Sequence, residues 1–277
     1  MTEELKKGMA GLIVDESSIS LPEGGIGKLS YRGIQIDDLA FNSTYLETAY
    51  LLLFGDLPKP EELEKFTRDV TFHTRLKVPM ENAMWECAKS SHPHPMNFLQ
   101  AASGMLGVFY PVDDVLDEDV RYQSVVRLVA KLPTMVAAIY RILNGDRIIA
   151  PRNDISFCAN FYWMLHEKEP DPIVEKIINS LMIIHADHGF NNSTFCCRNV
   201  GSSLADIYTA ITAGIGSLSG ALHGGAAEEA IKMLMEIGSP ENAEPYIMDK
   251  LAKKQPLSGL GHRIYKVKDP RAFVLQK

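Results

Sequence analysis

The chain has 277 residues and a formal net charge of −7, and 46% of its residues are hydrophobic while 23% are charged. This balance excludes a largely disordered chain, because enough apolar surface can be buried to offset the entropy of ordering. The acidic net charge argues against a nucleic-acid-binding protein, and no apolar run approaches the ~20 residues that a membrane span needs. Four cysteines are too few for a disulfide scaffold, so we expect a cytoplasmic protein.

The first expected elements are short strands. Residues 11–33 are rich in β-branched residues and glycine, which predicts one or two strands with a turn at Pro22–Gly27. After Gly33 the pattern becomes helical. Thr44 and Glu47 have the spacing of a capping box, and the glycine that follows residues 48–54 is expected to end the helix.

The rest of the chain reads as helices, so the predicted fold is mainly α with a small β element at its N-terminus. We expect helices over residues 60–77, 96–109, 117–144, 155–166, 172–187, 204–222, 226–237 and 240–254. Pro133 should mark a helix start or a kink. Residues 204–222 are dense in Ala, Gly and Ser, and since each interior Gly costs about 1 kcal/mol against Ala, this helix should be tightly packed.

Charge is distributed unevenly along the chain. Residues 250–277 carry a net charge of +7, and the remaining residues carry −14. A basic segment on an acidic body favours a local site for an anion, and a solvated helix face is the alternative. A division near His223 would separate the apolar helices before it from this charged segment, with a ligand cleft between the two parts.

Two histidines, His185 and His188, are spaced three residues apart. On a helix they would share a face, and with Cys196 and Cys197 they could be considered for zinc. The spacing fits no zinc pattern that we recognise. The alternative is a histidine that only satisfies a buried hydrogen bond, and the four residues by themselves do not decide between these interpretations.

Two glycine-rich segments carry the other histidines. Gly224 and Gly225 follow His223, and two glycines allow a ligand or the backbone to approach closely. Residues 257–266 run from a glycine-bracketed loop into His262 and several cations, a composition suited to phosphate or carboxylate. The spacing in this second segment is neither that of a P-loop nor that of a dinucleotide-binding fingerprint. The alternative for the His223 segment is a simple turn, and the alternative for residues 257–266 is a basic surface turn.

Taken together, the segments resemble the citrate synthase family over nearly the whole chain. The most specific matches are ALHGGA at 221–226 and GLGHRIYKVKDPR at 259–271, and HPM, KLPTMVAAIYR and HADH precede them in the family's order. The resemblance implies a two-domain helical fold, with residues 1–222 as a large dimer-forming domain and 223–277 as the start of a small domain. It also implies condensation of acetyl-CoA with oxaloacetate, no cofactor and no metal.

The resemblance assigns roles residue by residue. His223 would stabilise the enol of the thioester, and His262 would polarise the oxaloacetate carbonyl. His188 and Arg271 would hold oxaloacetate, in keeping with the preference of carboxylates for the forked guanidinium. The residues implied for CoA binding are Leu257, Ser258, Gly259, Leu260, Gly261 and Lys266. A homodimer, or a larger assembly of dimers, is also implied.

The sequence departs from the family pattern in one respect. The family's general base is an aspartate downstream of the DPR segment, and residues 1–277 offer no match to it. We therefore expect a chain that is C-terminally incomplete and inactive or nearly so, because losing a general base typically costs about 10²–10⁴-fold. The alternatives are a 2-methylcitrate synthase, which uses propionyl-CoA, and a non-catalytic relative.

Overall fold

The N-terminal part of the chain forms a small antiparallel sheet. The computed structural model describes residues 15–260 and 264–277. Its strands β1 (Ser20–Glu23), β2 (Lys28–Tyr31) and β3 (Ile34–Gln35) lie in the order β1-β2-β3. The β1–β2 turn ends at Gly27, whose positive φ of 66° is a conformation that glycine adopts without strain. Two expected strands and the turn are confirmed, but the third strand, β3, lies after Gly33, where we expected a helical pattern.

Helices make up most of the described chain, which confirms the mainly α fold. The α-helices are α1 (Ile36–Asn42), α2 (Tyr45–Phe54), α3 (Pro60–His73), α4 (Val78–Ser90), α5 (Pro95–Phe109), α6 (Glu118–Leu143), α7 (Phe157–His166), α8 (Pro172–Ile184), α9 (Asn192–Gly201), α10 (Ile207–Leu218), α11 (Gly225–Ile237), α12 (Ala243–Ala252) and α13 (Pro270–Gln276), and a 3₁₀ turn spans Pro240–Asn242. None of the described helices combines the length and the apolar character needed to cross a membrane.

Helix boundaries follow local signals in several places. The Thr44 side chain accepts a hydrogen bond from the Glu47 N–H at the start of α2, and Gly55 ends that helix in the left-handed conformation. The Glu47 carboxylate bonds to the Ser43 hydroxyl. Pro133 does not begin a helix, because α6 runs through it. Packing of α6 against α3, α5 and α7 offsets the helix cost of this proline.

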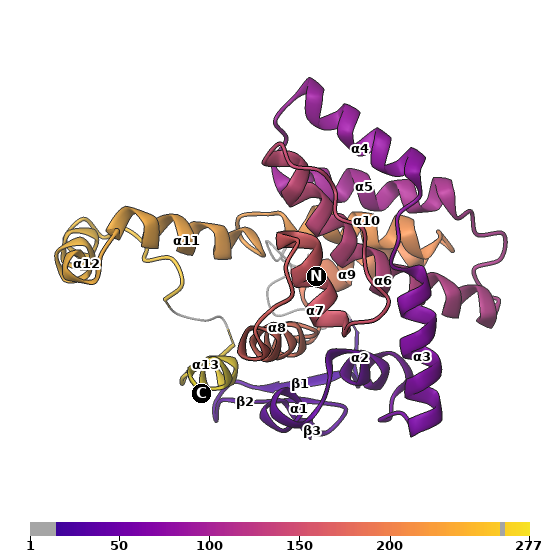
Figure 1. Ribbon diagram of the computed structural model, residues 1–277. Helices are drawn as coiled ribbons and strands as arrows, with labels where there is room; N and C mark the ends of the chain where they lie inside the picture. Colours follow the sequence, from indigo (N-terminus) through magenta and orange to yellow (C-terminus); the bar gives the residue numbers. More distant parts are fainter. Residues whose placement is uncertain (1–14, 261–263) are drawn as a thin grey trace, which may run out of the picture.

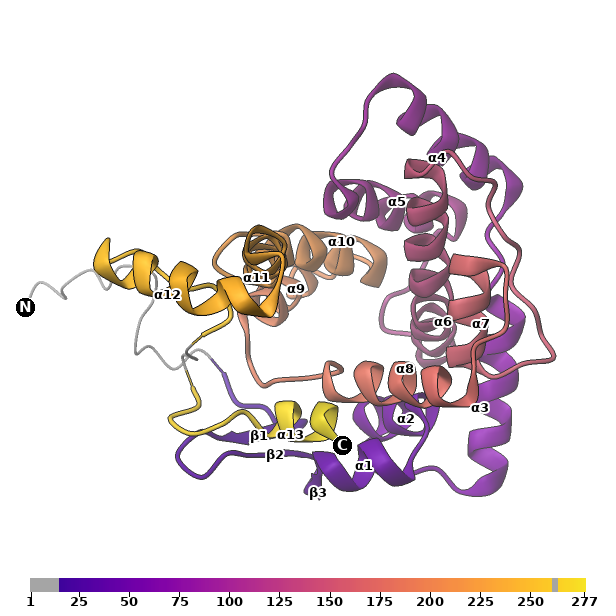
Figure 2. The same cartoon turned by 60° about the vertical axis from the view of Figure 1, so that its left-hand side comes forward.

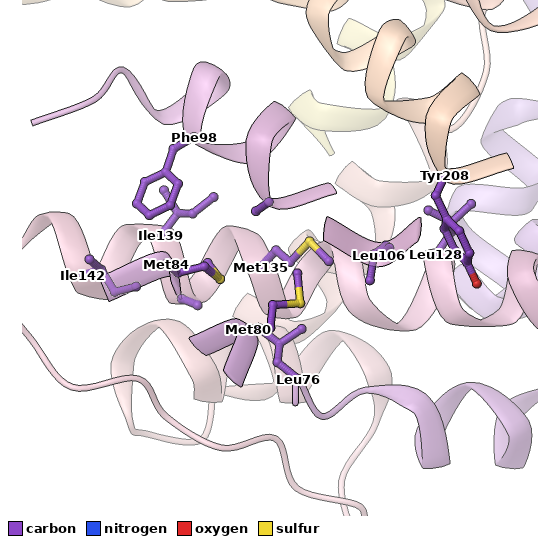
Figure 3. Packing of buried hydrophobic residues seen from close by; sticks show 12 residues of the cluster. Leu76, Met80, Met84, Phe98, Leu106, Leu128, Met135, Ile139, Ile142 and Tyr208 are labelled. Atoms are coloured by element: carbon purple, nitrogen blue, oxygen red, sulfur yellow. The ribbon is translucent and has the colours of Figure 1, made fainter. Parts of the chain in front are cut away.

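The main core lies where α4, α5, α6 and α10 meet. Figure 3 shows buried side chains of these helices gathered along α6, with Met80, Met84 and Met135 filling the space between longer aliphatic and aromatic neighbours. Tyr208 at the start of α10 is fully buried in this cluster. The core thus fixes α10, which also packs on α9 and leads into the loop that carries His223.

A second core joins the two ends of the described chain. Leu29 and Tyr31 of β2 pack with Ile183 and Ile184 at the end of α8 and with Val274 of α13. Figure 2 shows α13 lying beside the sheet, with α8 next to it. As a result, the residues that follow α8 and the residues that precede α13 come together next to the sheet.

The segment after His223 has a different environment. In Figure 1, α11 and α12 project away from the rest of the molecule as an arm, and neither helix has a buried residue. The preceding small-residue helix is shorter than predicted, since α10 ends at Leu218 and residues 219–222 form a turn. The chain returns from the arm to the sheet through residues 264–270.

Candidate active site

The turn after α8 presents His188. We expected the helix over residues 172–187 to include His185, and this is wrong: α8 ends at Ile184 with His185 as its C-cap. The Tyr31 hydroxyl lies 3.0 Å from the Ile183 and Asp187 carbonyl oxygens and accepts from the Asp187 N–H. These bonds and one from the Ser20 hydroxyl to the Asp187 carboxylate hold the turn. Burial raises the pKa of Tyr31 to about 12, so it remains a neutral donor.

The His188 imidazole contacts a buried tyrosine. Its Nε2 lies 3.1 Å from the Tyr265 hydroxyl, and the two rings meet edge to face with centroids 5.4 Å apart. Tyr265 is only 4% exposed. Desolvation and, to a lesser extent, the Asp269 charge raise the pKa of Tyr265 to about 12. Sequence reasoning did not single out Tyr265, although it lies inside the GHRIYK segment.

Arg271 lies in the first turn of α13, the helix that packs against the end of α8 from which His188 follows. Its Nε and Nη2 donate to the two carboxylate oxygens of Asp269, at 3.0 and 2.7 Å. Desolvation acts to lower the pKa of Arg271, but the ion pair with Asp269 outweighs it and the net shift is upward. The charge of Arg271 also acts on Tyr265 and Tyr31. The Arg271 guanidinium is therefore held in a fixed orientation by Asp269, and its charge acts on Tyr265, the residue that contacts His188.

His223 lies in the turn between α10 and α11. A Cβ at Gly224 would lie 2.6 Å from the Leu218 carbonyl oxygen, and one at Gly225 would lie 3.0 Å from that of Gly220. The two glycines therefore permit a close approach of the backbone itself, which is one of the two alternatives left open by the sequence.

The His223 ring is held by a hydroxyl group. Its Nε2 lies 2.9 Å from the Ser193 Oγ, which in turn donates to the Asn191 side-chain oxygen at 2.7 Å. Ser193 belongs to the first turn of α9, a helix that the sequence pattern did not predict. Because the single hydroxyl proton of Ser193 goes to Asn191, the Ser193 oxygen accepts from His223, and a neutral His223 carries its ring proton on Nε2.

The predicted CoA loop lies against the arm. A Cβ on Gly259, whose φ is +80°, would approach the Ala230 side chain on α11 to 3.3 Å. Leu257 and Ser258 are half-buried, and Leu260 is exposed. The Lys266 side chain is exposed, and its backbone N–H donates to the Gly24 carbonyl oxygen at 2.9 Å. Gly261 and His262 lie outside the described residues.

The zinc interpretation finds no support in this geometry. His185 is exposed, and its Nδ1 bonds to the Leu181 carbonyl oxygen of its own helix, while His188 contacts Tyr265. Within residues 15–260 and 264–277, no three His, Cys, Asp or Glu side chains are grouped so that they could hold a metal ion. All four cysteines are free thiols.

The site thus contains two imidazoles, His188 and His223, each held by a hydrogen bond, and a guanidinium, Arg271, held by Asp269. Comparison with known proteins shows the family to which the chain belongs. The model of the family described as "Citrate synthase, C-terminal domain" matches residues 8–277. The chain is 44% identical to citrate synthase of Synechocystis sp. over 274 residues, which is 99% of this chain and 68% of the relative. It is 42% identical to citrate synthase 2 of Bacillus subtilis over 98% of this chain and 72% of the relative.

Solved structures agree with this result. Citrate synthase of Pyrobaculum aerophilum superposes with a TM-score of 0.86 at 35% identity, over 97% of this chain and 69% of that one. The ternary complex of carboxymethyl coenzyme A and oxaloacetate with citrate synthase of Thermoplasma acidophilum gives 0.91 at 27% identity, over 99% of this chain and 71% of that one. The chain belongs to the citrate synthase family.

Proposed function

We propose that this protein condenses acetyl-CoA with oxaloacetate to form citrate and CoA. The observation that carries the proposal is that two residues far apart in sequence both act on the buried Tyr265: His188 through a hydrogen bond and Arg271 through its charge. The resemblance had assigned both residues to oxaloacetate. Membership of the citrate synthase family and the 44% identity to the Synechocystis sp. enzyme support the same function.

Oxaloacetate binding follows from the charges. A dicarboxylate needs cations and imidazole N–H groups to replace its water, and Arg271 supplies a guanidinium whose orientation Asp269 already fixes. A preoriented guanidinium loses little further side-chain freedom when a carboxylate binds. His188 would donate to the substrate from a turn that is held by Tyr31.

The condensation itself requires an enol. A proton leaves the methyl carbon of acetyl-CoA, that carbon forms a bond to the oxaloacetate carbonyl carbon, and the carbonyl oxygen takes up a proton. Water then cleaves the thioester, releasing CoA and citrate. Preorganised donors at a developing oxyanion are worth several kcal/mol. For His223 to donate to the thioester oxygen from Nδ1, the Ser193 hydroxyl proton would turn from the Asn191 oxygen to Nε2 when the substrate binds.

The remaining roles are proposals of the same kind. His262 would polarise the oxaloacetate carbonyl. The loop Leu257–Gly261 would contact CoA through its backbone, with the exposed Lys266 near the phosphates. The proton acceptor is assigned to no described residue, and that residues 1–277 alone are nearly inactive stays a prediction. The absence of a cofactor, the cytoplasmic location and the domain division at residue 223 also remain predictions.

Two further expectations belong to this proposal. We propose a homodimer in which the small-residue helix α10 contributes to the interface, and light scattering that gives a monomeric mass would contradict it. Propionyl-CoA is the alternative acyl donor, since a single CH₂ in a pocket changes selectivity by only ~1–3 kcal/mol. Specificity constants measured with both acyl-CoA substrates decide between citrate synthase and 2-methylcitrate synthase.

Thermal unfolding with and without oxaloacetate tests substrate binding separately from turnover. A ligand at 100 times its Kd stabilises the folded state by about 2.7 kcal/mol, so millimolar oxaloacetate should raise the Tm clearly. Malonate, a dicarboxylate without the keto group, is the control. Absence of any shift with oxaloacetate would favour the non-catalytic alternative.

A further inference from the structure

The contact between Tyr265 and His188 restricts the rotation of both side chains. The phenol is 4% exposed, its hydroxyl lies 3.1 Å from Nε2, and the rings meet at 72°. An imidazole attached to a turn can otherwise rotate about its χ2 bond, which is a broad torsion. An edge-to-face neighbour together with a hydrogen bond restricts this rotation.

The backbone on both sides of the contact is anchored to the N-terminal sheet. On the His188 side, the Tyr31 hydroxyl and the Ser20 side chain bind the Asp187 backbone and carboxylate. On the Tyr265 side, the Lys266 N–H donates to the Gly24 carbonyl oxygen at 2.9 Å. Because one sheet anchors both partners, the separation of hydroxyl and imidazole is set by the fold.

We propose that Tyr265 is a positioning residue that orients the His188 imidazole for oxaloacetate. This inference rests on the proposed function, because His188 is the oxaloacetate ligand there. A buried phenol with a pKa of about 12 retains its proton at neutral pH. When it donates that proton to Nε2, the proton of a neutral His188 lies on Nδ1, so Tyr265 selects both the ring orientation and the tautomer.

The test uses Tyr265→Phe, which removes the hydroxyl and retains the ring. The matched control is Tyr208→Phe, because Tyr208 is equally buried and its hydroxyl has no hydrogen-bond partner among the described residues. For Tyr265→Phe the KM for oxaloacetate should rise about tenfold, in line with the loss of one hydrogen bond, while the KM for acetyl-CoA stays within twofold. Tyr208→Phe should leave both constants unchanged.

A second measurement does not depend on turnover. The ¹⁵N resonances of the His188 ring, assigned with His188→Gln, report its tautomer directly. We expect them to shift in Tyr265→Phe and to remain in place in Tyr208→Phe. Unchanged resonances, or equal changes in the KM values of both substrates, would overturn the positioning role. Protein purified from its natural source that forms no citrate, while Tyr265→Phe still shifts the His188 resonances, would instead refute the proposed function.

Discussion

Gly24 and Gly25, two adjacent glycines in the β1–β2 turn, form a natural pair for testing how the sheet supports the site. A Cβ at position 24 would overlap the Ile264 carbonyl oxygen and lie 2.8 Å from its carbonyl carbon. A Cβ at position 25 would meet no atom of the described residues within 4 Å. The first neighbour is backbone and cannot rotate away, so Gly24→Ala must displace residues 264–266 while Gly25→Ala fits the space available.

The size of the effect follows from this geometry. Carbon–carbon contacts prefer about 3.5–4.0 Å, so the backbone at Ile264 must move by roughly 1 Å. Overpacking of this kind typically costs about 1–3 kcal/mol. A movement of about 1 Å near reacting groups can also cost 10²-fold in rate. Because Lys266 is bonded to the Gly24 carbonyl oxygen and Tyr265 is next to it, the displacement reaches the contact with His188.

The assay combines thermal unfolding with steady-state kinetics of the two variants. Gly24→Ala should lower the Tm by several degrees, on the scale of about 2–4 °C per kcal/mol for a domain of 150–250 residues, and should lower kcat/KM for oxaloacetate at least tenfold. Gly25→Ala should match the wild type in both. If the two variants behave alike, the sheet does not position the 264–268 segment.

Three further predictions concern single side chains. Lys131 is 2% exposed, and desolvation and then the charges of neighbouring cations lower its pKa to about 8. Above pH 8 the folded state therefore binds fewer protons than the unfolded chain, and the free energy of unfolding relative to Lys131→Met should rise by about 2 kcal/mol between pH 8 and 10. A difference that does not change with pH would refute the pKa shift. Iodoacetamide should label the exposed Cys87 within minutes but the buried Cys158 only after unfolding, because burial raises the pKa of the Cys158 thiol to about 12. Mass spectrometry that finds Cys87 and Cys158 labelled equally in the folded protein would contradict this. Ser193→Ala should lower kcat while the KM for oxaloacetate changes less, because the hydroxyl acts on His223. An unchanged kcat would show that Ser193 has no role in catalysis.

Local signals predicted the elements whose boundaries depend on local chemistry. The glycines of residues 22–27 gave the β1–β2 turn, Thr44 gave the start of α2, and Gly55 gave its end. Each signal acts through a backbone angle or a bond to a residue three positions away, so the sequence contains it directly.

The errors arose where distant contacts decide the structure. Residues 185–188 leave the helix because the Tyr31 hydroxyl, from a strand more than 150 positions earlier, binds the backbone there. Helix α9 has no buried residue and thus no apolar stripe by which to recognise it. The motifs identified His188, His223 and Arg271, but the contact of His188 with Tyr265 depends on the tertiary fold.

The central claim is that this protein joins acetyl-CoA to oxaloacetate. The most direct test incubates the protein, purified from its natural source, with [2-¹³C]acetyl-CoA and oxaloacetate and follows citrate by NMR together with free CoA. The account predicts ¹³C-citrate and CoA in equal amounts, with neither formed when oxaloacetate is omitted. CoA released at the same rate without oxaloacetate, or tight binding of both substrates without citrate, would contradict it.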